Sequence, residues 1–582
     1  METDHLLQEF PPVSTESWEE LIRKDLKGAD YAAKLIWQTE EGLAVKPYYR
    51  AEDVAGLHYA DARPGVFPYA RGARSTGDWR IREEIDALDC EDANRAAHAA
   101  VLAGAGEIAF RKANFESIAD LNALLANLEE IPAHFENAGV PQLRLLIERL
   151  SAQQRMAPVS TGWNPLANLD FAAEVIKAAP ASLVPFTIHG EEFEASGATA
   201  VEEVGFTLAA GIDFMAAMQK RNADLGRAAA SITFSFSIGA NYFFQIAKLR
   251  AFRTMWAQAA ESFGVPRKSA GARIHTRTSR WNKTIYDPHV NILRATTEAM
   301  SAALGGADII TVAPFDECYK APDEASRRLA RNTQIILKRE ALLSRVADPG
   351  AGSYCLEAIT DFIAREGWKS MQAIEATGGY RKALADGRIN QALEKSLAAK
   401  EKAVASRRRI FTGTTQHANL SEKALDRIEA SRLSGSRRGA WAYEQLRLRT
   451  ERHSAKSGKT PRVLLAEFGD PKMRAARSNF AANFFACAGF DLVAKRFSVA
   501  ERIPASDPDL IVLCSSDAEY LPLTIEVMAR MKMLGRGIPV IVAGSPESTK
   551  QLEEAGVADF IHIRSNPIEV LTKWQRLLGI KD

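Results

Sequence analysis

Three features that mark special classes of protein are scarce or missing in this sequence. Its five cysteines lie far apart, never at the paired spacing of a disulfide framework or a zinc site. No apolar run reaches the roughly 18–20 residues needed to cross a bilayer. Lys and Arg total 74 against 73 for Asp and Glu, so no excess charge favours nucleic acid or an anionic membrane. We therefore expect no metal site, no nucleic-acid partner and no membrane insertion.

A targeting segment is also missing from the first residues. They are polar and acidic, whereas a secretory signal begins with basic residues followed by an apolar run. An Arg/Ser-rich transit peptide is not visible either. The predicted location is therefore cytoplasmic.

The length of 582 residues exceeds what one compact core accommodates, so we expect two or three domains. Residues 1–60 contain one short helical pattern, from Trp18 to Leu26, followed by mixed polar sequence. A stretch of this length with no core of its own usually lies on another surface. We predict that residues 1–60 form an arm that lies on the next domain or on a partner subunit.

Residues 61–400 alternate short apolar, β-branched runs with longer helical patterns. Helical spacing of apolar residues occurs at 241–263 and 291–304. Strands that alternate with helices predict a parallel sheet, and several such units over about 300 residues favour a closed (β/α)8 TIM barrel. The runs that we predict as strands are 143–147, 184–189, 232–237, 273–276 and 308–312.

Two further segments follow the predicted barrel. Residues 401–460 are rich in Lys, Arg, Ser and Glu, which predicts a basic, solvated helical linker. Residues 461–582 alternate again, which predicts a small doubly wound, flavodoxin-like α/β domain. Its expected buried strands are 463–466, 510–513, 540–543 and 560–563.

An ordered set of motifs resembles the methylmalonyl-CoA mutase family. It begins with 64–72, Trp79 and Arg82, and it continues with 197–199, 236–251, 273–288, 315–317, 331–334 and 348–354. These motifs span roughly residues 60–360, and the flavodoxin-like segment follows where the family has its cobalamin-binding domain. The resemblance implies a mutase barrel and a cobalamin-type C-terminal domain.

The resemblance also indicates that the cobalt ligand is lost. Adenosylcobalamin mutases carry Asp-x-His-x-x-Gly after the first strand of the C-terminal domain, and the His coordinates cobalt. The matching positions here are Asp470, Lys472 and Ala475. A protonated Lys has no lone pair to give to cobalt, and the Cβ of Ala475 adds bulk where the loop would meet the corrin. His562 is the only histidine in the sequence of residues 461–582, and it lies at or after a late strand, so no nearby histidine replaces the lost ligand.

Two further cofactor motifs of the family are altered as well. The Ser-x-Leu motif, which packs near the nucleotide tail, matches Ser515 and Asp517, so a carboxylate replaces an apolar residue. The Gly-Gly motif matches Ala543 and Gly544. We therefore predict that this chain binds no cofactor.

The barrel positions that carry the family's chemistry are changed in the same way. The Tyr near the substrate radical matches Glu84, and the Tyr-His pair that polarises the migrating carbonyl matches Glu191 and Glu192. An ionised Glu offers no hydrogen to a carbonyl and repels a substrate carboxylate. The resemblance therefore implies a non-catalytic small subunit, paired as a heterodimer with a homologous large subunit that holds adenosylcobalamin and interconverts succinyl-CoA and (R)-methylmalonyl-CoA.

Two alternatives remain open at the level of the sequence. Five carboxylates could form an acid–base site for a cobalamin-independent reaction on an acyl-CoA. Alternatively, they only fill a cleft that no longer has a function. They are Glu83, Glu84, Glu191, Glu192 and Glu194. The chain could also be a regulatory module that retains acyl-CoA binding. The residues suited to a CoA phosphate or acyl carboxylate are Arg71, Arg273, Thr278 and Ser279.

The remaining histidines and cysteines have simpler interpretations. His275 lies on an expected barrel strand, where a satisfied core or substrate-facing histidine is more common than a metal ligand. The five cysteines are predicted to be core or near-surface residues.

Overall fold

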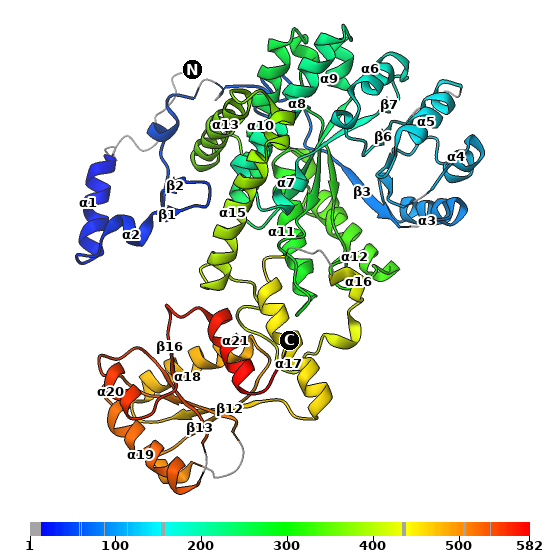
Figure 1. Ribbon diagram of the computed structural model, residues 1–582. Helices are drawn as coiled ribbons and strands as arrows, with labels where there is room; N and C mark the ends of the chain where they lie inside the picture. The colour runs from blue at the N-terminus through cyan, green and yellow to red at the C-terminus, as the bar shows by residue number, and fades with distance from the viewer. Residues whose placement is uncertain are drawn as a thin grey trace.

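The computed structural model describes residues 13–57, 59, 61–86, 88–112, 114–152, 157–433, 438–503, 508–535 and 537–581. Parts of the predicted arm (1–12), of the predicted linker (434–437) and of the flavodoxin-like segment (504–507) lie outside the described residues. The chain forms a large upper unit, which contains the barrel, and a smaller unit below it (Figure 1).

The upper unit is a parallel barrel. Within the described residues its sheet has nine strands in the order β7-β6-β5-β4-β3-β11-β10-β9-β8. The two end strands are halves of one strand interrupted at Pro185, so the chain itself closes the ring as eight strands. They are β3 (Arg80–Ile85), β4 (Glu107–Phe110), β5 (Ala133–Phe135), β6 (Val159–Thr161), β7 (Leu183–Val184) with β8 (Phe186–His189), β9 (Ile232–Ile238), β10 (Ile274–Thr278) and β11 (Ile309–Thr311).

Strand β9 shows why the sequence folds in this way. All seven of its residues are buried, and the side chains alternate between two environments. Phe234 and Phe236 pack edge-on against Phe252 of the outer helix α10 (Tyr242–Ser262). Ser235 and Ser237 instead face the barrel axis, where they line a cavity.

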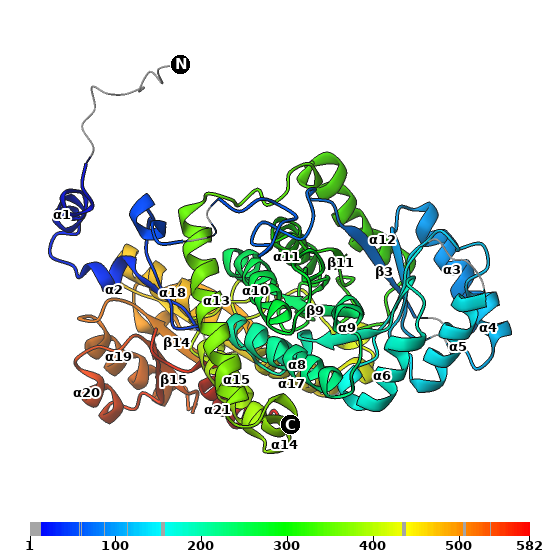
Figure 2. The ribbon, with the colours of Figure 1, turned by 90° about the horizontal axis from the view of Figure 1, so that it is seen from above.

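The outer helices surround the barrel (Figure 2). The prediction of a strand at 143–147 is wrong, because these residues belong to α5. Leu143, Leu146 and Leu150 are buried at helical spacing, so a short apolar run here is one face of a helix. The helices are α3 (Cys90–Leu102), α4 (Ile118–Leu124), α5 (Val140–Ala152), α6 (Leu169–Ala178), α8 (Ala200–Lys220), α9 (Leu225–Ala230), α10, α11 (Val290–Leu304), α12 (Glu324–Ile335), α13 (Tyr354–Glu375), α14 (Tyr380–Ala385) and α15 (Arg388–Ala405).

The smaller unit is a doubly wound parallel sheet. Its strand order is β13-β12-β14-β15-β16, the flavodoxin-like order, so the fold class predicted from the sequence is confirmed. The strands are β12 (Arg462–Glu467), β13 (Asp491–Arg496), β14 (Leu510–Cys514), β15 (Val540–Ala543) and β16 (Asp559–Ile561). The helices are α18 (Pro471–Ala486), α19 (Tyr520–Met533), α20 (Thr549–Glu554) and α21 (Pro567–Leu577).

The segment between the two units is packed, and it is not the solvated helix that the sequence led us to expect. It contains the short α16 (Ala430–Leu433) and α17 (Trp441–Ser457), with irregular chain before them. The side chains of Arg438 and Glu444 are almost fully buried and form an ion pair at 2.5 Å. Trp281, which follows β10, shares a core with Phe411 and Tyr443 of this segment. The carboxyl ends of the barrel strands therefore face the packed segment and the smaller unit.

The first two helices of the chain stand away from the barrel (Figures 1 and 2), whereas Leu43 and Val45, which follow them, pack against the barrel core. Helices α1 (Thr15–Asp25) and α2 (Tyr31–Leu35) precede a small hairpin, β1 (Trp37–Gln38) and β2 (Ala44–Val45). None of the residues of α1, all of which the structure describes, is buried. Within the described residues, no helix is long and apolar enough to span a membrane.

Candidate functional site

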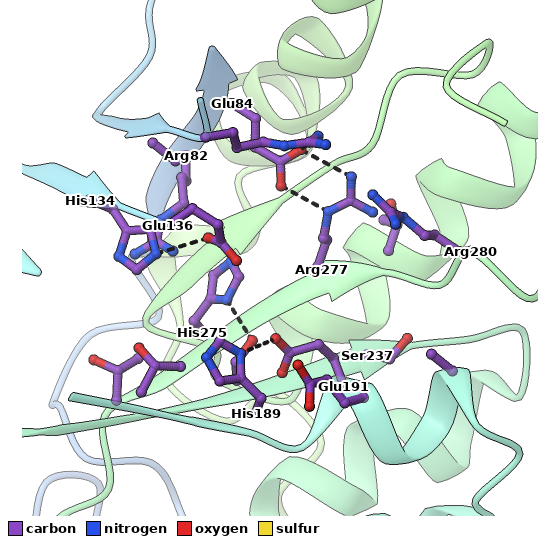
Figure 3. A pocket seen from close by; sticks show the side chains of 18 of the residues that line it. Arg82, Glu84, His134, Glu136, His189, Glu191, Ser237, His275, Arg277 and Arg280 are labelled. Carbon is purple, nitrogen blue, oxygen red and sulfur yellow. Dashed lines mark hydrogen bonds and ion pairs between the residues drawn. The ribbon is translucent and has the colours of Figure 1, made fainter. Parts of the chain in front are cut away.

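A cavity of about 330 Å³ opens at the carboxyl ends of the barrel strands. Its walls come from β3, β4, β5, β8, β9 and β10 and from the short helix α7 (Glu191–Ala195) (Figure 3). The carboxyl ends of barrel strands are where TIM-barrel enzymes place their catalytic groups. The three positions that match the family's catalytic Tyr and Tyr-His residues all line it, namely Glu84, Glu191 and Glu192.

Arg277 of β10 closes one side of the cavity. Its Nε and Nη2 donate to the two carboxylate oxygens of Glu84 on β3 at 2.8 and 3.0 Å (Figure 3). Its Nη2 also donates to Glu317, in the loop after β11, at 2.7 Å. Burial opposes the ionisation of both carboxyls, but the charge of Arg277, together with its hydrogen bonds and the charges of nearby arginines, outweighs burial and lowers the pKa of each. Glu84 is therefore an internal counter-ion.

Two further arginines extend this network over the cavity mouth. Arg111 donates to Glu84 at 2.8 Å, and Arg280 donates to Glu317 at 2.7 Å. We refer to Glu84, Arg111, Arg277, Arg280 and Glu317 as the mouth network. Sequence reasoning missed its arginines, although Arg277 stands two residues after His275 on the same strand, an inward-facing position by strand alternation.

His189 and Glu191 form a second ion pair on the opposite wall (Figure 3). The Nδ1 of His189 lies 2.7 Å from Glu191, and its Nε2 lies 2.7 Å from the carbonyl oxygen of Gly162. Both partners are acceptors, so both ring nitrogens carry a proton. Burial opposes this charge, yet the hydrogen bond and charge of Glu191 raise the pKa of His189 to about 10. The carboxylate of Glu191, like that of Glu84, is therefore paired with a cation of the chain itself.

The five predicted carboxylates do not form one cluster. Glu192 lines the cavity, and burial raises its pKa. Glu194 lines it too and accepts a hydrogen bond from Ser279 at 2.8 Å. Glu83 instead points outward to Arg331 of α12, at 2.5 Å, because neighbouring residues of a strand face opposite sides. The barrel mouth therefore holds four of the five.

The inward-facing histidines are held neutral or paired. His275 lies 2.9 Å from both Ser235 and Thr311, and burial lowers its pKa well below the ordinary value. His134 pairs with Glu136 at 3.0 Å. Within the described residues, no group of three or more His, Cys, Asp and Glu side chains is arranged to hold a metal ion. All five cysteines are free thiols.

The residues considered for CoA binding are dispersed. Arg71 is buried and paired with Glu357. Burial lowers the pKa of Arg273, which is not part of the cavity wall. Ser279 is bonded to Glu194, as described above. Of these candidates Thr278 lines the cavity, and its hydroxyl oxygen accepts a hydrogen bond from the backbone N–H of Ala313.

The positions that match the cobalamin loop lie at the carboxyl edge of the smaller sheet. Asp470 is the N-cap of α18, and its side chain accepts from the N–H of Met473 at 2.8 Å. This hydrogen bond occupies one oxygen of the carboxylate at the start of the helix. Lys472 and Ala475 lie on the first turns of α18, and both are exposed.

The other degenerate positions converge on the same edge. Ser515 is fully buried at the end of β14, and Ala543 ends β15. Asp517 forms an ion pair at 2.9 Å with Arg477 of α18. A Cβ added at Gly544 would lie 3.3 Å from the Asp517 carboxylate, so this pair stands directly in front of the glycine.

These residues do not fit cobalamin. The ammonium of Lys472 has no lone pair for cobalt. The loop at Gly469 is covered by the carboxylate of Glu519, and a Cβ built on that glycine would overlap with it. The edge therefore offers neither a ligand to the metal nor a clear surface for the macrocycle.

Comparison with known proteins agrees with this architecture. The family model for methylmalonyl-CoA mutase matches residues 38–114 and 162–466. The methylmalonyl-CoA mutase small subunit of Porphyromonas gingivalis is 36% identical over the whole of both chains. The small subunit of Streptomyces virginiae is 31% identical over 99% of this chain and 98% of its own. The methylmalonyl-CoA mutase of Escherichia coli is 26% identical over 94% of this chain and 96% of its own.

The barrel, the C-terminal sheet, the ordered motifs and these full-length similarities lead to one assignment. The chain belongs to the methylmalonyl-CoA mutase family, and its full-length similarity extends to the small subunits of that family.

Proposed function

We propose that this chain is the non-catalytic small subunit of a heterodimeric, adenosylcobalamin-dependent methylmalonyl-CoA mutase. In this proposal a homologous large subunit holds the cofactor and interconverts succinyl-CoA and (R)-methylmalonyl-CoA, and this chain stabilises it. The domain division predicted from the sequence and the cytoplasmic location in propionate metabolism belong to the same proposal.

The mouth network is the observation that carries the proposal. Arg277 binds Glu84 and Glu317 across the place where a mutase barrel needs free hydrogen-bond donors. Side chains that neutralise one another present little field to a substrate carbonyl, and moving them would leave buried charges unpaired. On the opposite wall, the ion pair between His189 and Glu191 likewise occupies side chains that would otherwise face a substrate.

Helix α1 supports the idea of a partner. Trp18 and Leu21 are 43% and 60% exposed, and Trp18 stacks on Tyr48 of the segment beside it. Apolar side chains that a chain leaves exposed on a protruding helix mark surfaces for association. We propose that this helix contacts the large subunit.

The proposal is tested by measuring bound cobalamin and mutase turnover for the chain alone and after co-expression with a homologue that carries Asp-x-His-x-x-Gly. We expect no cofactor and no turnover for the lone chain, and one cobalamin with full activity in a one-to-one complex. As a matched control, Lys472→Ala in this chain should leave the activity of the complex unchanged. Turnover by the lone chain would refute the proposal.

Acyl-CoA binding by this chain is the second candidate, and the remaining cavity favours it. The cavity of about 330 Å³ is lined by Thr278, and Lys112 and Arg280 lie at its rim. Equilibrium titration of CoA and succinyl-CoA into the isolated chain separates this module from a purely stabilising subunit. Saturable binding that Arg280→Ala weakens would establish the module.

A further inference from the structure

The carboxyl edge of the smaller sheet has the geometry of a ligand site. β12 and β14 are neighbours, and the chain continues from them to opposite sides, to β13 and to β15. Open α/β sheets bind ligands in the crevice at such a topological switch point. The loops that follow these two strands contain Gly469 and Asp470 on one side and Ser515 to Glu519 on the other.

A carboxylate of the chain itself occupies this crevice. One oxygen of Glu519 accepts hydrogen bonds from the hydroxyls of Ser515 and Ser516, at 2.7 and 2.6 Å. The same oxygen lies 3.2 Å from the backbone N of Ser516 and 3.4 Å from that of Asp470. Four donors from two separate loops therefore converge on one anionic atom.

The surroundings show that the carboxylate is held in place. The hydroxyls of Ser515 and Ser516 lower the pKa of Glu519 to about 2, so it is ionised at neutral pH. Gly469 has a φ of +66°, which brings its backbone under the carboxylate with no side chain between them. The Arg477–Asp517 pair covers the neighbouring part of the edge in front of Gly544.

We propose that Glu519 is a specificity-determining residue that closes this edge to a corrinoid, independently of the missing cobalt ligand at position 472. The inference rests on the proposed function, since it concerns the site that the catalytic relatives use. A ligand that brings a phosphate or macrocycle edge must displace the carboxylate, break four hydrogen bonds and approach a like charge. Restoring the histidine at position 472 alone therefore does not restore cobalamin binding.

The test compares three variants of the full chain. The background is Lys472→His with Ala475→Gly, which restores the loop motif. Glu519→Ala is added to this background in one variant, and Glu526→Ala, an exposed position on the same helix α19, is added in the matched control. Hydroxocobalamin is the probe, measured by equilibrium dialysis and by the change in its absorption spectrum when imidazole binds cobalt.

We expect the variant that lacks Glu519 to bind hydroxocobalamin about tenfold or more tightly than the background. The reason is that the ligand no longer has to displace a carboxylate and break its hydrogen bonds. The Glu526→Ala control should match the background. If Glu519→Ala unfolds the chain, Glu519→Gln keeps the volume, removes the charge and takes its place.

The outcomes separate this inference from the proposed function. Equal affinity with and without Glu519, including binding by neither, would overturn the role assigned to Glu519 and leave the proposed function intact. Cobalamin bound by the unaltered chain would instead contradict the proposed function.

Discussion

Replacing Arg277 with methionine removes the cation at the centre of the mouth network. Its side chain is 13% exposed, and those of its partners Glu84 and Glu317 are 15% and 8% exposed. Methionine keeps much of the length of the side chain and none of its five donors. The variant therefore leaves two buried carboxylates facing each other with less positive charge between them.

The magnitude follows from the burial of these groups. Removing one partner of a buried ion pair costs about 3–5 kcal/mol, because the remaining charge is left uncompensated. Arg111 and Arg280 still bind the two carboxylates, which places the expected loss near the lower limit. A loss of about 3 kcal/mol corresponds to a decrease in Tm of about 6 °C for a large domain.

The pH dependence gives a second signature. The network lowers the pKa of Glu84 and Glu317 in the folded chain, so it contributes stability above their unfolded pKa. That contribution is lost as the pH falls through the folded pKa. The difference between wild type and Arg277→Met should therefore be largest near pH 7 and should shrink steadily below about pH 5.

The measurement is thermal unfolding monitored by circular dichroism between pH 3 and 8. Arg267→Met is the matched control, because Arg267 forms an exposed pair with Glu261 that is worth at most about 1 kcal/mol. A decrease in Tm at pH 7 no greater than that of Arg267→Met would refute the inference that the mouth network holds its side chains in place by buried ion pairs.

Three further predictions test other parts of the chain. Glu191→Gln should destabilise the chain at pH 7 in unfolding experiments. The difference should shrink as the pH rises from about 6.5 towards 10, because the His189–Glu191 pair stabilises the folded chain only while His189 is protonated. Glu519→Gln should destabilise the C-terminal sheet at pH 7 and approach wild type as the pH falls from about 4.5 towards 2, as chemical denaturation at each pH would report. Trp18→Ala with Leu21→Ala should weaken pull-down of the large subunit by tenfold or more while leaving the Tm of the lone chain unchanged, and intact binding would exclude α1 from the interface.

The sequence by itself determined the fold class and the family. Apolar runs alternating with helical patterns give a parallel barrel and a doubly wound sheet, because each strand of a parallel sheet is buried on both faces. The failure at 143–147 has a physical reason, since a run of five residues is too short to show the helical spacing of Leu143, Leu146 and Leu150, and a short apolar run also suits a buried strand. The sequence also predicted which positions are altered, because Glu84, Glu191 and Lys472 differ in chemistry from the residues of the family motifs that it resembles.

Only the tertiary structure decided what those residues do. Arg277 meets Glu84 across 193 positions of sequence and Glu317 across 40, contacts that exist because the barrel closes. Glu83 and Glu84 are adjacent in the chain, yet Glu83 faces α12 and Glu84 faces the cavity. Alternation along a strand requires that the two side chains point to opposite sides, and the closure of the barrel decides which of them points inward. Glu519 reaches the donor at Asp470 because β12 and β14 lie side by side, which composition and periodicity do not encode.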